Sequence, residues 1–464
     1  MSSVKFLLIH PASARARALR GRRRPTDRIF QQSVLPCLYV AAATPPWVHT
    51  HIVDEDVESI DFEADVDLVG LSFMTLSAPR AYEVADRFRR ERGIPVIMGG
   101  FHPTVCPEDA LSHADAICVG DAENKMAQIM VDLRAGRLQR IYDGPPPDLA
   151  DLPLPNRRLL SRWRHAPIDT IQATRGCPYR CTFCSVTAFH NHTYRTRPVE
   201  QVVDELRTLR TRVLFVDDNL IVDRDYAMEL FAAIAPLKKR WYSQCSTSIA
   251  DDAELLRRAA ASGCRGLFVG FESLSEPNLD AWRKGFNRPR TYARTVKKLH
   301  NAGIAVFAGI VFGMDDDTPA VFRRTLEFLD QAELDFAAAN VLTPFPGTPL
   351  YDEMERAGRI FERDWAKYDF NHVVFHPQHM SAATLQHGAY WVRAQFYDRK
   401  PVARRIMRSL GYLDPGTVLH AIVPLNVGFR SRMGRSGTMQ TGLEYCPPPA
   451  DPHDRWSPVS QGVE

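Results

Sequence analysis

The chain has 464 residues, too many for one ordinary hydrophobic core, so two or three domains are expected. Apolar residues make up 45% of the chain and charged residues 24%, which are values of a globular protein. The formal net charge of +3 is small for this length and argues against a nucleic-acid platform.

The N-terminal part alternates short apolar segments with helical patterns. We expect strands at residues 4–9, 51–53, 68–73, 96–98 and 116–119, with helices between them. This series predicts a flavodoxin-like α/β domain over residues 1–143, built on an open parallel sheet of five strands. Ligands of such sheets bind beyond the carboxyl ends of the strands, where residues 72–75, 99–104 and 120–123 lie.

A second alternating series follows a proline-rich stretch, residues 144–166, which predicts an extended linker. Strands are expected at residues 170–172, 213–216, 243–247, 267–271, 306–311 and 338–342. Six such units predict a partial (β/α)6 barrel over residues 167–358, whose chemistry would lie at the carboxyl ends of its strands.

Residues 359–464 predict a helical C-terminal extension and a tail. Aromatic and histidine side chains of this segment would either line a pocket or pack the added helices: Trp365, Tyr368, His372, His376, Tyr390 and Trp391. Residues 417–429 are apolar but too few to span a bilayer, as is the apolar run at residues 4–9. We therefore expect no signal peptide and no transmembrane segment, and residues 417–429 would dock on the body or touch a membrane surface.

Three cysteines, Cys177, Cys181 and Cys184, follow the first barrel strand with the spacing C-x3-C-x2-C. Three thiolates on one tight loop can hold three irons of a cubane iron–sulfur cluster and leave the fourth iron open for a small molecule. A structural zinc site normally takes four protein ligands, and an odd number of closely spaced cysteines does not suit a disulfide framework. Three unrelated buried thiols are the remaining alternative.

Polar residues follow three of the later barrel strands. Asp217 and Asp218 end the second strand and Ser246 ends the third; such side chains either face a cofactor or cap the next helix. Glu272 and Ser273 end the near-continuous apolar run of the fourth strand. A carboxylate there needs a partner, which is either a bound cofactor or a structural ion pair.

The cysteine run resembles the cluster-binding signature of the radical S-adenosylmethionine (SAM) superfamily, C-x3-C-x-aromatic-C. The resemblance implies that Cys177, Cys181 and Cys184 bind a 4Fe-4S cluster whose open iron chelates SAM, and that the cluster cleaves SAM to methionine and a 5′-deoxyadenosyl radical. Residues 309–313 are similar to the adenine-contacting G-x-I-x-G element of that family. The SAM-binding residues expected on this basis are Phe183, Asp217, Asp218, Ser246, Glu272, Ser273, Gly309 and Gly313.

The order of the two domains resembles the cobalamin-binding branch of the superfamily. By this resemblance the cobalamin-binding residues are Ser72, Thr75, Gly99, Gly100, His102, Thr104, Gly120 and Glu123. No D-x-H-x-x-G sequence follows the first strand, so no histidine ligand to cobalt is expected from this domain, and His102 is expected to fix its loop by hydrogen bonding. Related methylthiotransferases hold a second cluster with three N-terminal cysteines, but Cys37, Cys106 and Cys118 fit ordinary buried thiols better.

The resemblance implies a cobalamin-dependent radical SAM enzyme, and the leading hypothesis is a methyltransferase acting on an unactivated carbon. One alternative is a radical SAM cyclase or rearrangement enzyme without net methylation; another is a non-catalytic cobalamin or redox sensor. The expected partners are a small-molecule or lipid substrate and an electron donor such as flavodoxin or ferredoxin, with peripheral membrane contact left open. Nine cysteines and an oxygen-sensitive cluster suit a reducing cytoplasm.

Overall fold

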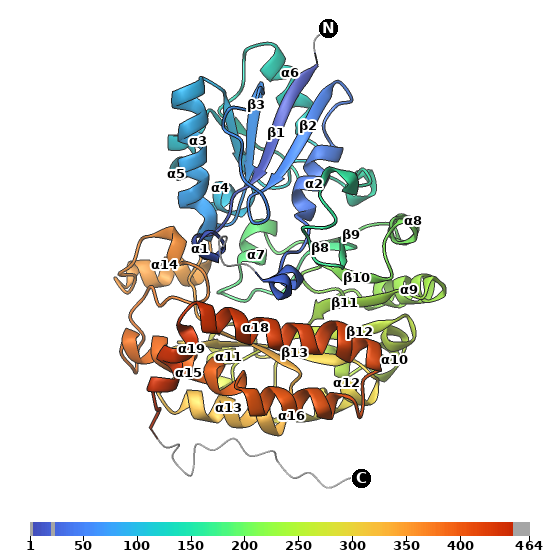
Figure 1. Cartoon of the computed structure of the whole chain (residues 1–464), viewed down its shortest axis with the longest axis vertical. Coiled ribbons are helices and arrows are strands. Elements are labelled where there is room, and N and C mark those ends of the chain that lie inside the picture. Colours follow the sequence, from blue (N-terminus) through green and yellow to red (C-terminus); the bar gives the residue numbers. More distant parts are fainter. Residues whose placement is uncertain (1–2, 20–23, 449–464) are drawn as a thin grey trace.

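The computed structural model describes residues 3–19 and 24–448. Its N-terminal sheet contains six parallel strands in the order β2–β1–β3–β4–β5–β6 (Figure 1). The bounds are β1 Val4–His10, β2 Val48–Asp54, β3 Leu68–Ser72, β4 Val96–Gly99, β5 Ala116–Cys118 and β6 Ile141–Tyr142. The flavodoxin-like arrangement is confirmed, with one strand more than expected. The extra strand, β6, has only two residues, and a pair is too short to show a period-two pattern.

Helices cover both faces of this sheet, as the near-continuous apolar strands require. Helices α3 (Ala78–Arg92) and α5 (Pro107–His113) pack on one face, and α2 (Leu35–Ala42) and α6 (Met126–Arg134) pack on the other. Because β1 lies between β2 and β3, the chain first adds β2 on one side of β1 and then crosses over to add β3 and the later strands on the other side. This change of direction opens a crevice at the carboxyl ends of β1 and β3.

The second sheet is also parallel, in the order β14–β13–β12–β11–β10–β7. Its strands are β7 Asp169–Ile171, β10 Arg212–Phe215, β11 Arg240–Cys245, β12 Cys264–Glu272, β13 Ala305–Phe312 and β14 Phe336–Val341. The partial (β/α)6 barrel is therefore confirmed. Strand β11 begins three residues before its expected start because Arg240 pairs in register with Arg212 of β10, a contact that no apolar pattern signals.

Helices surround the outside of this barrel: α8 Val199–Thr208, α9 Arg224–Ile234, α10 Ala253–Ala261, α12 Tyr292–Asn301 and α13 Val321–Gln331. The C-terminal extension adds α15 Ala382–Phe396, α16 Arg399–Ser409, the π-helical turn η10 Val418–Ile422, and α18 Val423–Arg435. Figure 1 shows α16 and α18 lying across the barrel. Arg435 of α18 is ion-paired with the buried Asp27 of η2 (Pro25–Phe30), which ties the extension to the N-terminal segment.

A short antiparallel hairpin carries the start of the cysteine loop. It consists of β8 (Thr174–Gly176) and β9 (Tyr194–Thr196), and α7 (Ser185–His190) lies between these strands in sequence. Figure 1 places the hairpin and α7 between the two sheets. The sequence did not predict this hairpin because three-residue strands rich in Arg, Thr and Gly have no apolar alternation.

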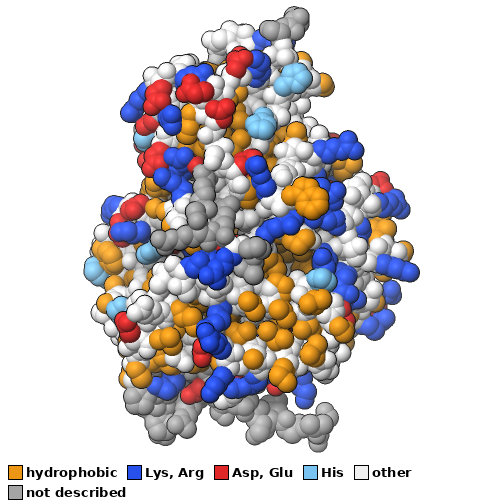
Figure 2. Space-filling view, viewed as in Figure 1, with side chains coloured by type: hydrophobic (Ala, Val, Ile, Leu, Met, Phe, Trp, Pro, Cys, Tyr) orange, Lys and Arg blue, Asp and Glu red, His pale blue; other side chains and the backbone are white. Residues whose placement is uncertain are grey.

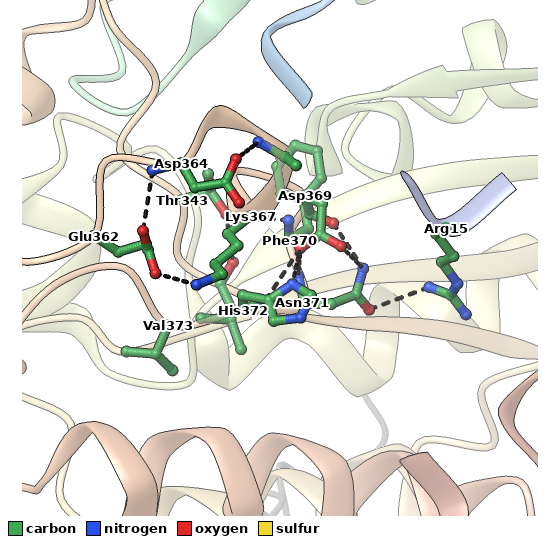
Figure 3. Close-up of polar contacts among 12 residues, drawn as sticks. Arg15, Thr343, Glu362, Asp364, Lys367, Asp369, Phe370, Asn371, His372 and Val373 are labelled. Carbon is green, nitrogen blue, oxygen red and sulfur yellow. Dashed lines mark hydrogen bonds and ion pairs between the residues drawn. The ribbon is translucent and has the colours of Figure 1, made fainter. Parts of the chain in front are cut away.

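Residues 362–373 connect the extension to the rest of the chain (Figure 3). The Asn371 side chain accepts a hydrogen bond from Arg15 of α1 (Ala14–Leu19) at 3.3 Å and another from the buried Arg393 at 2.8 Å. Trp365 Nε1 donates to Asp109 Oδ2 of the N-terminal domain at 3.0 Å. This segment joins the two domains. Its histidine, His372, is not among the residues that line the cavities described below.

No helix among the described residues is both long and apolar enough to cross a bilayer. Residues 417–429 form η10 and the start of α18, where Val418 and Ile422 are buried and Leu419 is exposed. They therefore dock on the body through part of their surface and leave Leu419 and Val427 exposed.

Candidate active site

The three cysteines of the loop line one cavity of about 190 Å³ at the carboxyl ends of the barrel strands. The loop turns sharply at Gly176, which has a φ of +86° and sits so close to Thr193 that a Cβ would lie 2.2 Å from its carbonyl oxygen. Only glycine is compatible with that backbone conformation and that approach. The chain thus begins the loop immediately at the end of β8 and directs the thiols inward.

A cysteine thiol must lose its proton before it can bind iron, because only the thiolate is a metal ligand. Burial raises the pKa of Cys181 to about 12, and the Lys284 ammonium acts in the opposite direction. Within the described chain no three His, Cys, Asp or Glu side chains are gathered as the ligands of one ion would be. A cubane cluster would take one thiolate from each cysteine, each on a different iron.

Glu272 and Lys284 form an ion pair in the wall of the same cavity. Lys284 Nζ lies 2.5 Å from Glu272 Oε1, and both side chains are 13% exposed. Glu272 has a φ of +63° and follows a register shift between β12 and β13, so this non-glycine residue is held in a strained conformation. The strained backbone directs the carboxylate toward the cysteines, where sequence analysis expected either a cofactor contact or an ion pair.

Four of the expected SAM-binding residues line this cavity: Phe183, Asp218, Ser246 and Glu272. The other four lie outside its wall. Asp217 is fully buried and accepts hydrogen bonds from the backbone N–H of Ala173 and Thr174, so it anchors the start of the hairpin. Ser273 accepts from the Ser275 N–H.

The two glycines of the fifth barrel strand have packing roles. A Cβ on Gly309 would lie 2.9 Å from the Phe268 ring, so glycine there lets Phe268 turn into the barrel. Gly313 has a φ of +101° and donates its N–H to Asp317 Oδ2 at 2.9 Å. Neither glycine is among the residues that line the cysteine cavity.

A second cavity, of about 470 Å³, lies between the two domains. Four of the expected cobalamin-binding residues line it: Ser72, Gly100, Gly120 and Glu123. At Gly120, which has a φ of +67°, a Cβ would meet no atom within 4 Å and would project into open space. Gly120 thus leaves room for a flat ligand such as a corrin ring, whereas a Cβ on Gly100 would lie 2.8 Å from the Phe73 carbonyl oxygen, so glycine is needed there for packing.

The remaining expected cobalamin residues, Thr75, Gly99, His102 and Thr104, are not part of the cavity wall. His102 is fully buried, and its ring nitrogens lie 3.3 Å from Thr75 Oγ1, 3.0 Å from the Tyr82 hydroxyl and 3.2 Å from Asp109 Oδ2. Thr104 Oγ1 donates to the Gly100 carbonyl and accepts from the Gly120 N–H. These side chains fix the loops that carry the glycines.

The N-terminal cysteines behave as separate thiols. Burial raises the pKa values of Cys37, Cys106 and Cys118 to about 12, which keeps all three protonated near neutral pH. Cys37 lies in α2, Cys106 immediately before α5, and Cys118 in β5, so they come from three separate elements.

Sequence reasoning missed several residues that face the interdomain cavity, including Tyr39, Phe101, Arg175 and His190. They come from a helix, from a strand–helix turn and from the cysteine loop, so no single motif contains them. Arg175 is the one with a local signal, since it stands two residues before Cys177.

The ionisation of His190, which lines this cavity, makes the stability of the protein depend on pH. Burial lowers the pKa of His190 to about 4, and its Nδ1 lies 3.4 Å from Arg195 Nη2, a donor that requires the neutral ring. Between pH 6.5 and 4 the unfolded chain binds more protons at this site than the folded one, so stability falls as the pH is lowered. At pH 5 the loss is about 2 kcal/mol.

We therefore expect His190→Gln to be more stable relative to the wild type at pH 5 than at pH 7. Urea unfolding of the cofactor-free protein at both pH values measures this difference. An equal difference at the two pH values would contradict the assigned ionisation.

Arg175 joins the domains by ion pairs. Its guanidinium lies 2.6 Å from Glu123 Oε1 and 3.1 Å from Asp121 Oδ1, and all three side chains are nearly buried. Asp121 keeps a second partner, Arg195, at 2.7 Å. Replacing Arg175 would therefore leave Glu123 as the unpaired charge.

The expected cost of Arg175→Met is about 3 kcal/mol of unfolding free energy, because a buried carboxylate loses its counter-ion. Arg207→Met is the matched control: it removes an exposed pair with Asp204 and should change stability by less than about 1 kcal/mol. Chemical denaturation measures both. Equal effects of the two substitutions would show that the Arg175 pairs are not buried in solution.

The two cavities share part of their walls. Val186 and Asp218 line both the cysteine cavity and the interdomain cavity. Asp218 also accepts a hydrogen bond from the Gly176 N–H at 2.9 Å, which holds the hairpin beside β10. A ligand on the cysteine side and one on the interdomain side would consequently be neighbours.

The chain is similar to known proteins over most of its length. Residues 171–329 match the family model of the radical SAM superfamily, and residues 38–130 match that of the B12 binding domain. It is 30% identical to bacteriochlorophyllide d C-12(1)-methyltransferase of Chlorobaculum tepidum, covering 87% of this chain and 90% of that one. It is 27% identical to the hopanoid C-2 methylase of Rhodopseudomonas palustris, covering 74% of this chain and 68% of that one.

A solved structure has the same fold. It is the radical S-adenosylmethionine methyltransferase TsrM from Kitasatospora setae, with a TM-score of 0.63 at 17% identity over 95% of this chain and 99% of that chain. The two family matches fall on the two sheets described above, in the same order along the chain. The chain therefore belongs to the radical SAM superfamily, in the branch whose members carry a B12 binding domain before the barrel.

Proposed function

We propose that this protein is a cobalamin-dependent radical SAM methyltransferase that transfers a methyl group to an unactivated carbon. The observation that carries the proposal is the shared wall at Val186 and Asp218, which puts the thiol-lined cavity beside the interdomain cavity. When bound, the cluster with SAM supplies a 5′-deoxyadenosyl radical and cobalamin supplies a methyl group. Relatives named as methyltransferases of bacteriochlorophyllides and hopanoids support the same reaction class.

The residues of this chain would bind and position these groups. Cys177, Cys181 and Cys184 would hold the cluster, with Phe183, Asp218, Ser246 and Glu272 around SAM. Ser72, Gly100, Gly120 and Glu123 would lie against cobalamin. The buried Arg175 ion pairs, which join the domains beside this cavity, would help to keep water away from a radical.

We also infer a reducing cytoplasm and an electron donor such as flavodoxin or ferredoxin. All nine cysteines are free, which fits a compartment that keeps thiols reduced. The exposed apolar residues of α16 and η10, Met407 and Leu419, support peripheral contact with a membrane.

The test is the product ratio in an anaerobic assay with reductant, cobalamin, methyl-labelled SAM, and either a bacteriochlorophyllide or a hopanoid. Methyl transfer to carbon should yield one S-adenosylhomocysteine and one 5′-deoxyadenosine per labelled product. 5′-Deoxyadenosine with an unlabelled product would favour a cyclase or rearrangement enzyme. Release of neither nucleoside would favour the sensor.

A further inference from the structure

A third cavity, of about 700 Å³, occupies the inside of the barrel. Its walls are mostly apolar and come from the inward faces of the strands, from η2 and from the η10–α18 segment; they include Ile29, Leu214, Phe268, Phe307, Phe336 and Leu425. This cavity, called the barrel chamber below, is the largest of those described. Neither the cluster nor cobalamin accounts for it, since their own cavities are lined mainly by other residues.

The barrel chamber adjoins both cofactor cavities. Gln244 and Phe268 line the chamber and the cysteine cavity, and Val216 lines the chamber and the interdomain cavity. Along β10 and beyond its end, alternate residues face inward. Arg212 and Leu214 face the chamber, Val216 faces the chamber and the interdomain cavity, and Asp218 faces the two cofactor cavities. The chamber thus meets the interdomain cavity at Val216, and two positions further on Asp218 separates that cavity from the cysteine cavity.

The charges in the chamber wall have one sign. Arg28 and Arg212 line it, the exposed His420 stands at its edge, and no Asp or Glu is among its lining residues. Within the described ranges, neither arginine forms an ion pair with a carboxylate. Arg28 instead donates to the carbonyl oxygens of His165 at 2.6 Å and Arg162 at 2.9 Å, which positions its guanidinium without neutralising it.

Exposed apolar side chains lie on the η10–α18 segment, which forms part of the chamber wall. Leu419 of η10 is 61% exposed, and Val427 of α18 is 42% exposed. Figure 2 shows hydrophobic side chains gathered on the face where α16 and α18 lie in Figure 1, with Lys and Arg side chains around them. A molecule entering from the η10–α18 side would meet these apolar side chains first and positive charge inside.

We propose that the barrel chamber binds the substrate, and that the substrate is a large, mainly apolar molecule with a carboxylate or phosphate held by Arg28 and Arg212. This inference rests on the proposed function, because the reacting carbon must lie beside Val216, next to both cofactors. Arg212 and Val216 are four positions apart along β10 and its end, so their Cα atoms lie about 13 Å apart and an elongated substrate is needed to reach both. The arginines set which substrates bind and in which orientation.

Probe binding to the holoenzyme tests this without turnover. Anilinonaphthalene sulfonate and its uncharged analogue phenylnaphthylamine share an apolar skeleton and differ in the anion. Arg212→Gln and Arg28→Gln should each weaken sulfonate binding about tenfold and leave the neutral probe unchanged. Arg207→Gln, on the exposed face of α8, is the control and should change neither. A loss that is equal for the two probes, or no loss, would overturn the assignment.

Two further measurements locate the site and name the anion. Leu214→Trp fills the chamber and should abolish binding of both probes; wild-type affinity in this variant would show that the probes bind elsewhere. Dodecanoate or dodecyl phosphate should displace the sulfonate better than dodecanol, and the stronger of the two identifies the preferred anion. Equal displacement by dodecanol would overturn the charge preference.

Different results would refute the methyltransferase function and the anionic substrate class. Selective binding of the anionic probe without any methylated product would refute the proposed function alone. Methyl transfer by a protein without a preference for anions would refute the substrate class alone.

Discussion

Cys181→Ala is expected to abolish cluster binding and SAM cleavage. Cys181 is the most buried of the three loop thiols at 7% exposure, and it lines the cysteine cavity. Two remaining thiolates cannot hold a cubane that needs three. Iron content and the visible absorbance of the anaerobically reconstituted protein should fall to background, as should 5′-deoxyadenosine formation.

Cys106→Ala is the matched control. Cys106 is a partly exposed thiol outside the cysteine cavity, and its replacement should leave iron content and 5′-deoxyadenosine formation near wild-type values. A cluster that survives in Cys181→Ala, or one that is lost equally in Cys106→Ala, would contradict the assignment of the loop as the ligand set.

Lys284→Met is expected to destabilise both the fold and the cluster. The substitution leaves Glu272 buried without its counter-ion, which costs about 3–5 kcal/mol. Burial opposes a charge at Lys284, but Glu272 and the nearby thiols raise the pKa of Lys284 above its ordinary value, so the ammonium is present at neutral pH. Its loss would raise the pKa values of the loop thiols further and reduce the thiolate available for iron.

Three measurements follow the effect of Lys284→Met: chemical denaturation, iron content, and the cluster midpoint potential by redox titration. The potential should become more negative, because the reduced cluster loses a neighbouring positive charge. Lys284→Arg should restore most of the potential. The double variant Lys284→Met with Glu272→Gln should recover part of the stability, since no buried charge is left unpaired. A potential that does not move would show that Lys284 is too far from the cluster to affect it.

The sequence predicted the two sheets well because their strands are buried on both faces. Such strands appear as apolar runs between turn residues, as at β1, β3 and β13. It failed where pairing is short or polar, as at β6 and the β8–β9 hairpin. Those strands are stabilised by neighbours that are distant in the chain, and distant neighbours leave no periodic pattern.

The sequence predicted site residues unevenly for a related reason. Gly100 and Gly120 face the interdomain cavity, as sequence reasoning expected, because a strand end requires their backbone freedom. Asp217, as acidic as Asp218 and one position before it, points the other way and binds backbone N–H groups. Alternation along a strand decides which of two adjacent carboxylates faces a ligand, and sequence alone does not state the register.

By itself the sequence identified the three cysteines that we propose as cluster ligands, because they lie within eight consecutive residues and their spacing is local. It also determined the order of the two domains. Only the tertiary structure decided that Lys284 supports the thiols, that Arg175 meets Glu123 across 52 positions, and that a cationic chamber adjoins both cofactor cavities. These contacts depend on how separate helices and strands dock, and docking is set by packing across the whole barrel rather than by any local pattern.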